Sequence, residues 1–366
     1  MQNLLSLIAL LIYSAVLQGQ TTIKYVTDRS TEAIPGYDSF FRQNKTWRGG
    51  DGAASIPLGN GKVLWLFGDS FISTDTSGSR THSTLVRNSI GIQEGLNMKK
   101  GTLQFYWGES DQKPTSFFNR NDSNWYWPGH GIMINDRLII FLMNIHKTDS
   151  GLGFEASGWS AVLIENPKED PTKWKLKFVL GKNPYKTIAG SAAVLRDADY
   201  LYAYGVVEPS THEVHLMRWS LDDAYSGNLN DPEYWSSNKW ITQKDMQQPP
   251  DVLFIGGTEF SVHYDRRLKK YVQVQSFGFG EAVIGIRVSD KPEGKWSEPM
   301  IIHRPDYTGI KKPFMYSAKA HPEQKRKEIC ITYNINSFDF NELLNNHEIY
   351  FPKVIWLNLK RLIPIQ

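Results

Sequence analysis

The sequence has little cysteine, little excess charge and few long apolar runs. Cys330 is the single cysteine among 366 residues, so no internal disulfide can form, and its apolar neighbours predict core packing. Lys and Arg exceed Asp and Glu by only three (41 against 38), too small a surplus for a nucleic-acid binder. After residue 20 no apolar run approaches the length of a membrane span.

The one long apolar run lies at the N-terminus. Residues 1–20, MQNLLSLIALLIYSAVLQGQ, end in small and polar residues and predict a secretory signal peptide cleaved near Gly19 or Gln20. The run lacks an early Lys or Arg, so a buried N-terminal helix or a retained anchor is the alternative. We expect an exported monomer, periplasmic or extracellular, with residues 21–366 forming one domain.

Helical periodicity is also scarce, and short apolar strands separated by turn residues dominate. A hairpin followed by a third strand occurs five times, with a period of about 60 to 75 residues. The second strands are predicted at 62–68, 137–143, 200–206, 270–276 and 328–334, and the third strands at 89–95, 160–166, 214–220, 283–289 and 353–359. Five such units predict an all-β fold, a five-bladed β-propeller, and a two-sheet sandwich is the alternative. Residues 21–28 are expected to add an outer strand to the last blade.

The first hairpin, within residues 47–71, carries a carboxylate at each open end. Asp51 precedes its first strand and Asp69 follows its second strand. Because paired strands run antiparallel, the start of one lies beside the end of the other. The two acids are therefore expected on one rim of one sheet.

A closed propeller would gather further polar and aromatic residues on the same face as this pair. Glycoside cleavage needs two carboxyl groups that flank the scissile bond, one protonated and one ionised. The catalytic candidates are Asp51, Glu259 and Asp69, and the substrate-binding candidates are Glu208, His130, Arg87, Asn88, Trp127, Ser191, Tyr316 and Asn334.

Several of these residues also have a structural interpretation. Asp51 and Asp69 could be turn residues that bond their own backbone. Glu208 could be an ordinary loop residue, His130 a satisfied core histidine, and Arg87 the structural partner of a rim acid. Zinc-ligand spacing, a phosphate-binding glycine loop and a Gly-x-Ser-x-Gly elbow are missing from the sequence.

The segments GGDGAASIPLGNGKVLWLFGDSF, RNSIGIQ, GTEFSVHYD and VSDKPEGKWSEP resemble exported bacterial propellers of the glycoside-hydrolase type. These belong to a domain-of-unknown-function group related to endo-D-arabinanases, and more distantly to arabinanases, xylosidases and levansucrases. The resemblance implies that Asp51 is the base or nucleophile and Glu259 the general acid. Asp69 would orient the sugar and raise the pKa of the acid through its own charge.

The expected function is hydrolysis of a glycan, an arabinan-like polymer first, without a cofactor or catalytic metal. A structural calcium ion in the central channel is left open. The competing hypothesis is a lectin-like propeller whose carboxylates only bind sugar hydroxyls. The separation of the two acids across an open pocket distinguishes these functions.

Overall fold

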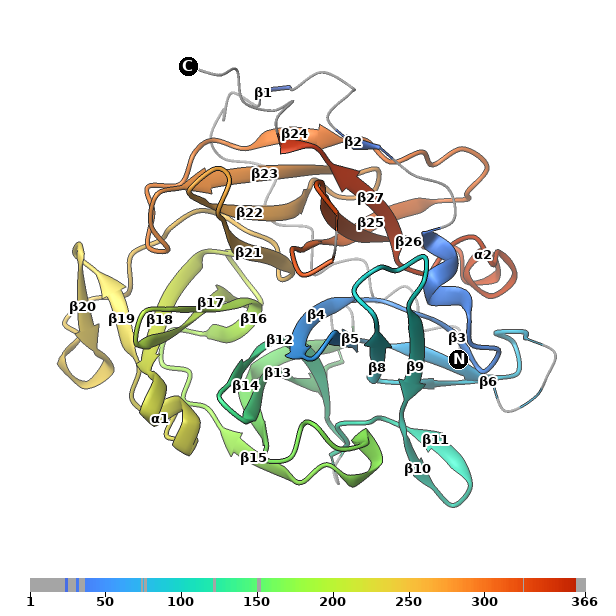
Figure 1. Ribbon diagram of the computed structural model, residues 1–366, viewed down its shortest axis with the longest axis horizontal. Helices are drawn as coiled ribbons and strands as arrows, with labels where there is room; N and C mark the ends of the chain where they lie inside the picture. Colours follow the sequence, from blue (N-terminus) through green and yellow to red (C-terminus); the bar gives the residue numbers. More distant parts are fainter. Residues whose placement is uncertain are drawn as a thin grey trace.

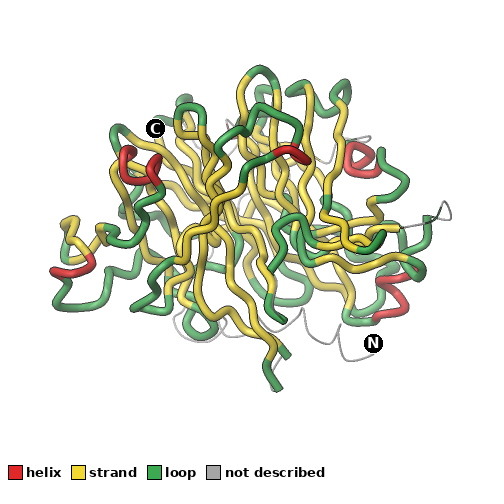
Figure 2. The backbone as a smooth tube through the Cα atoms, turned by 90° about the horizontal axis from the view of Figure 1, so that it is seen from below, coloured by secondary structure: helices red, strands yellow, loops and turns green. Residues whose placement is uncertain are grey.

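The computed structural model describes residues 24–25, 31–32, 37–73, 75, 78–120, 123–149, 153–324 and 326–359. The predicted signal peptide, residues 1–20, lies outside this part of the chain. The described residues form an all-β structure, as the sequence predicts, and Figure 2 shows its few helices at the margins of the strands.

Five sheets of the described chain contain the five predicted hairpins, each followed by its predicted third strand. Sheet one consists of β4 (Ala54–Gly59), β5 (Lys62–Phe67), β8 (Ser89–Glu94) and β9 (Thr102–Tyr106), and sheet two of β12 (Trp125–Ile134), β13 (Arg137–Lys147), β14 (Phe154–Ile164) and β15 (Leu176–Leu180). Sheet three consists of β16 (Thr187–Asp197), β17 (Tyr200–Val207), β18 (Val214–Ser220), β19 (Glu233–Ser236) and β20 (Lys239–Thr242). Sheet four contains β21 (Phe260–Asp265), β22 (Lys270–Phe277), β23 (Val283–Ser289) and β24 (Met300–His303), and sheet five contains β25 (Pro313–His321), β26 (Ile329–Ser337) and β27 (Lys353–Leu357).

The first strands of these sheets meet in a cycle. β4 contacts β12, β12 contacts β16, β16 contacts β21, β21 contacts β25, and β25 contacts β4. Figure 1 shows the five sheets arranged around a common centre in the order of the sequence. Residues near the starts of the first strands are therefore brought together from all parts of the chain.

Shorter elements complete the fold. β3 (Trp47–Gly50), β6 (Ser70–Ser73) and β7 (Ser83–Val86) form a three-stranded sheet, and β10 (Gly108–Ser110) pairs with β11 (Lys113–Thr115). The helices are α1 (Leu221–Ser226) and α2 (Phe340–Asn345), with 3₁₀ turns η3 (Asp38–Arg42), η4 (Pro171–Lys173) and η5 (Gln243–Asp245). Gly50 pairs with Ser70 across β3 and β6, so the neighbouring Asp51 and Asp69 lie on one rim, as predicted from the hairpin.

The N-terminal segment pairs with a different sheet from the one predicted. β1 (Lys24–Tyr25) lies within the predicted strand 21–28 but pairs in parallel with β24 of sheet four, and not with the last sheet. The outer edge of sheet five is instead covered by β2 (Thr31–Glu32), which pairs antiparallel with β27. Both sheets offer an open edge of backbone groups, and the sequence does not say which edge each short segment reaches.

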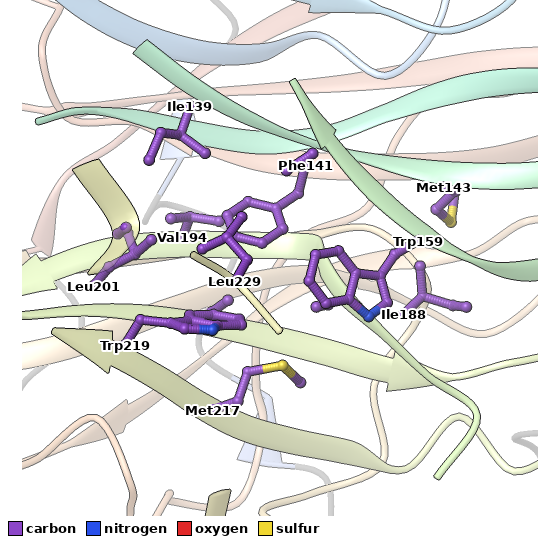
Figure 3. Close-up of a cluster of buried hydrophobic side chains, with 14 of the residues drawn as sticks. Ile139, Phe141, Met143, Trp159, Ile188, Val194, Leu201, Met217, Trp219 and Leu229 are labelled. Carbon is purple, nitrogen blue, oxygen red and sulfur yellow. The ribbon is translucent and has the colours of Figure 1, made fainter. Parts of the chain in front are cut away.

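Large aromatic and aliphatic side chains fill the spaces between the sheets. Figure 3 shows Phe141 and Trp159 of sheet two packing towards Trp219 of sheet three. A second cluster holds Trp47 and the buried Cys330 together, which confirms the core position of the cysteine. Burial of several indole and phenyl rings stabilises the contacts between sheets and fixes the rim on which the acids lie.

Candidate active site

Asp51 lies in the glycine-rich turn that joins β3 to β4. Its backbone oxygen accepts a hydrogen bond from the Gly68 amide at 2.9 Å. A Cβ atom on Gly68 would lie 2.4 Å from Asp51 Oδ1, so the carboxylate occupies space that only glycine leaves free. The start and the end of the first hairpin are thus packed directly against each other.

The two oxygens of Asp51 have different surroundings. Oδ2 accepts hydrogen bonds from the phenols of Tyr316, at 2.8 Å, and Tyr350, at 3.4 Å. Oδ1 has no hydrogen-bond partner within the described chain. Burial, and then the neighbouring Asp69 and Glu259 carboxylates, raise the pKa of Asp51 well above its usual range. Burial also raises the pKa of both tyrosines, so their phenols stay protonated and remain donors.

Asp69 has both oxygens occupied. Oδ1 accepts a hydrogen bond from Trp127 Nε1 at 2.7 Å, and Oδ2 one from Arg87 Nη1 at 2.8 Å. Its side chain is only 3% exposed. Burial raises the pKa of Asp69, and the charge of Arg87 and the bond from Trp127 oppose that rise. The carboxylate therefore positions an arginine and an indole, and each of its oxygens already accepts a bond from the protein.

Glu259 has one occupied oxygen. Oε1 accepts a hydrogen bond from Lys319 Nζ at 2.6 Å and lies 3.0 Å from the Ser317 hydroxyl. Oε2 has no hydrogen-bond partner among the residues that the structure describes, and 26% of the side chain is exposed. Ser317 Oγ also lies 2.8 Å from the backbone oxygen of Gly52, which follows Asp51, so one hydroxyl lies between the two acid-bearing segments.

Aromatic side chains of sheet two form a wall beside the acids. Trp127 is partly exposed, and its ring meets Trp125 and Phe154 in edge-on contacts. The Arg87 guanidinium lies 4.4 Å from the Trp125 ring centre. A partly exposed indole beside cationic and carboxylate groups can stack on the C–H face of a sugar while the charged groups bond its hydroxyls.

The structure thus brings together Asp51, Asp69, Glu259, Arg87, Trp127 and Tyr316 of the predicted site residues. The other candidates have buried polar groups in different surroundings. Asn88 donates to the backbone oxygens of Phe118 and Tyr126, and His130 bonds the backbone of Ser55 and Val194.

Glu208, Ser191 and Asn334 also lie in the interior. The Glu208 carboxylate bonds His212 and Thr258, and its side chain is fully buried. Asn334 donates to the backbone oxygen of Gly50, the residue before Asp51, at 3.1 Å. The Ser191 hydroxyl is buried without a described partner. A substrate-binding role for these side chains stays a prediction.

Sequence reasoning missed Lys319 and Tyr350. Lys319 had a signal, because it is the one charged residue in the otherwise uncharged segment PFMYSAKA. Tyr350 lies in the connection between α2 and β27 and has no such signal. It reaches Asp51 and the backbone oxygen of Asp69 from almost 300 residues away along the chain.

The described residues contain no group of three or more His, Cys, Asp or Glu side chains placed to hold a metal ion. The calcium ion considered from the sequence stays a prediction. In the same part of the chain, no helix combines the length and apolar character needed to cross a bilayer.

Comparison with known families places the chain. A family model described as a domain of unknown function, DUF5005, matches residues 35–357. The chain belongs to the DUF5005 family. No curated protein matches this DUF5005 chain.

Several solved structures are similar to the DUF5005 chain. The crystal structure of a candidate hydrolase from Bacteroides ovatus superposes with a TM-score of 0.70 at 17% identity, covering 96% of this chain and 98% of that chain. An α-L-arabinofuranosidase from Podospora anserina matches with a TM-score of 0.48 at 9% identity, over 86% and 92% of the two chains. An α-L-arabinofuranosidase from Clostridium thermocellum matches with a TM-score of 0.45 at 16% identity, over 77% and 82%.

Proposed function

We propose that this DUF5005 protein is a glycoside hydrolase built on a five-bladed β-propeller, with Asp51 and Glu259 as its catalytic pair. The observation that carries the proposal is the hydrogen bonding of the two carboxylates. Each has one oxygen anchored by protein donors and one oxygen without a described partner, Oδ1 on Asp51 and Oε2 on Glu259. Two acids held in this way, beside the partly exposed indole of Trp127, suit a reaction in which both carboxyl groups act on one bond.

Asp69 supports the pair without touching the sugar. With both oxygens bonded to Arg87 and Trp127, it positions the two side chains best placed to contact substrate. Arg87 uses one guanidinium nitrogen for this bond, and its side chain is 26% exposed. Its remaining N–H groups are donors for sugar hydroxyls, and Trp127 is the stacking surface.

The substrate that we propose to test first is an arabinan-like glycan, in keeping with the sequence resemblance. The proposed enzyme is exported as a monomer after removal of residues 1–20. N-terminal sequencing of the secreted protein tests the cleavage near Gly19 or Gln20, and light scattering tests the monomer.

The deciding experiment measures product release from a panel of arabinans, xylans and other plant and bacterial glycans. Wild type is compared with Asp51→Asn and Glu259→Gln, and with Glu109→Gln, which removes an exposed acid on the β10–β11 hairpin. We expect cleavage by wild type and Glu109→Gln, and a loss of about 10³-fold or more in both site variants.

Two other outcomes would change the proposal. Cleavage that survives both Asp51→Asn and Glu259→Gln would refute the catalytic pair but not the hydrolase. Tight binding of a polymer without any product would favour the lectin-like function, in which the same carboxylates only hold hydroxyl groups.

A further inference from the structure

Lys319 is a buried cation at the centre of the proposed site. Its side chain is 5% exposed, and it lies in β25, the first strand of sheet five. Nζ donates to Glu259 Oε1 at 2.6 Å, to the Gly52 backbone oxygen at 2.7 Å and to Ser317 Oγ at 2.7 Å. These three bonds use all three hydrogens of the ammonium group, so the contacts fit the charged lysine.

An irregularity in β25 makes this arrangement possible. The register between β25 and β26 shifts between Tyr316 and Lys319, and Ser317 has a φ of +60°. In a regular strand, Tyr316 and Ser317 would point to opposite faces of the sheet. Here Tyr316 bonds Asp51, while Ser317 and Lys319 bond Glu259, so one strand anchors both acids.

The two acids are anchored by chemically different donors. Glu259 Oε1 receives a bond from an ammonium, which favours the carboxylate form directly. Asp51 Oδ2 receives bonds from two neutral phenols and lies near two other carboxylates. If one proton is shared between the two acids, it is therefore better accommodated on Asp51, at the free Oδ1.

We propose that Lys319 is the positioning residue that fixes which acid carries the proton: it holds Glu259 as the carboxylate and leaves Asp51 as the proton donor. This inference rests on the proposed function, and it reverses the roles implied by the family resemblance.

The resulting step is balanced. Asp51 Oδ1 gives its proton to the glycosidic oxygen as the bond from that oxygen to the anomeric carbon breaks. Glu259 Oε2 takes a proton from a water molecule whose oxygen bonds to the anomeric carbon. The products are an alcohol and a free reducing sugar, and a proton passes from Glu259 back to Asp51 through solvent.

Other ionisable groups surround Asp51 and Glu259, and the Lys319 variants tested below leave these groups unchanged in sequence. Asp69 and Arg87 form an ion pair beside Asp51, Tyr350 bonds both aspartates, and the imidazoles of His130 and His321 lie near Lys319. Burial lowers the pKa of His130 to about 4 and that of His321 well below its usual range, so both rings are neutral and Lys319 is the cation that faces Glu259.

The first test reads the protons directly and needs no substrate. Protein carrying ¹³C in the aspartate and glutamate carboxyl carbons is titrated by NMR, with Asp51→Asn and Glu259→Gln used for assignment. We expect Glu259 to become protonated at a lower pH than Asp51. The opposite order in the wild-type protein would overturn the proposal, even if Lys319 variants fail to fold.

The second test removes the charge. Lys319→Met keeps the length of the side chain, and Lys319→Arg keeps the positive charge. We expect the Glu259 carbon of Lys319→Met to titrate about one to three pH units higher than in wild type, and that of Lys319→Arg to stay within one unit. An unchanged Glu259 titration in folded Lys319→Met would overturn the role of Lys319.

Kinetics then separate this role from a purely structural one. The acid limb of the kcat/KM profile on a cleaved glycan reports the protonation of Glu259, the proposed base. In Lys319→Met this limb should move to higher pH by about one to three units, as in the NMR titration. A structural role would lower the amount of folded protein and leave the limb in place, which would count against the proposal. If no glycan is cleaved at all, the proposed function fails, and the NMR titration still decides how Lys319 acts on Glu259.

Discussion

Gly68 provides a sharp test of the position of Asp51. Its backbone does not adopt a positive φ, so alanine can take the same conformation, but the new Cβ atom would lie 2.4 Å from Asp51 Oδ1. Ordinary contacts begin at about 3.4 Å, so the carboxylate must move by about 1 Å. A displacement of that size at a reacting group costs about 10²-fold in rate, or about 2.7 kcal/mol of activation free energy.

The assay compares kcat/KM and the urea unfolding midpoint of Gly68→Ala with those of wild type and Gly257→Ala. Gly257 is the matched control, because its added Cβ would have no neighbour closer than the Glu259 backbone oxygen at 3.9 Å. We expect Gly68→Ala to lose about 10²-fold in kcat/KM with a small loss of stability, and Gly257→Ala to lose little of either. Full activity in a folded Gly68→Ala protein would refute the assignment of Oδ1 as the reacting oxygen.

Three further predictions concern stability and binding. Burial lowers the pKa of His263 to about 4, below its unfolded value near 6.5, so the unfolded chain binds the extra proton between these values and stability is lost as the pH falls through them. The full loss is about 3 kcal/mol, and His263→Phe should reduce the acid sensitivity seen in urea unfolding at pH 7 and at low pH. Trp127→Phe leaves Asp69 Oδ1 without its donor. The substitution should lower the unfolding free energy by about 1–3 kcal/mol in the same urea assay and raise the KM for the glycan. An unchanged urea midpoint would contradict a stabilising bond between Trp127 and Asp69. Arg80 is buried and donates to the backbone oxygens of four residues. Arg80→Met should therefore lower the unfolding free energy by about 3 kcal/mol or more. A change below about 1 kcal/mol, the value of one exposed hydrogen bond, would refute this prediction.

The strands could be predicted from the sequence because each one is a short apolar run bounded by turn residues. The predicted strand 137–143 lies within β13, and 283–289 coincides with β23. The strand pairing of the N-terminal segment could not be predicted, because two-residue strands such as β1 and β2 have almost no sequence pattern of their own. Their positions depend on which sheet edges remain open after the rest of the chain has folded.

The aspartate pair could be predicted for the same reason as the strands, because a single hairpin places both residues. The contacts of Asp51 with sheet five were harder to predict, because Tyr316 and Asp51 are separated by 265 positions. A strand pattern does not reveal that β25 contains a register shift, and a regular strand would have placed Ser317 and Tyr316 on opposite faces. Sequence reasoning therefore named Tyr316 without predicting its bond to Asp51, and it missed Lys319 and Tyr350.

Free oxygens distinguish the three acids that the sequence names as catalytic candidates. Both oxygens of Asp69 accept bonds from the protein, whereas Asp51 and Glu259 each keep one oxygen without a described protein donor. A buried charge that loses a partner is costly, which makes Asp69 a poor reactant and a good anchor. The same reasoning gives Asp69→Asn a distinct signature: the amide can still accept one bond but cannot pair with the Arg87 charge, so it should raise KM through misplaced Arg87 more than it lowers kcat. A loss confined to kcat would instead place Asp69 among the reacting groups.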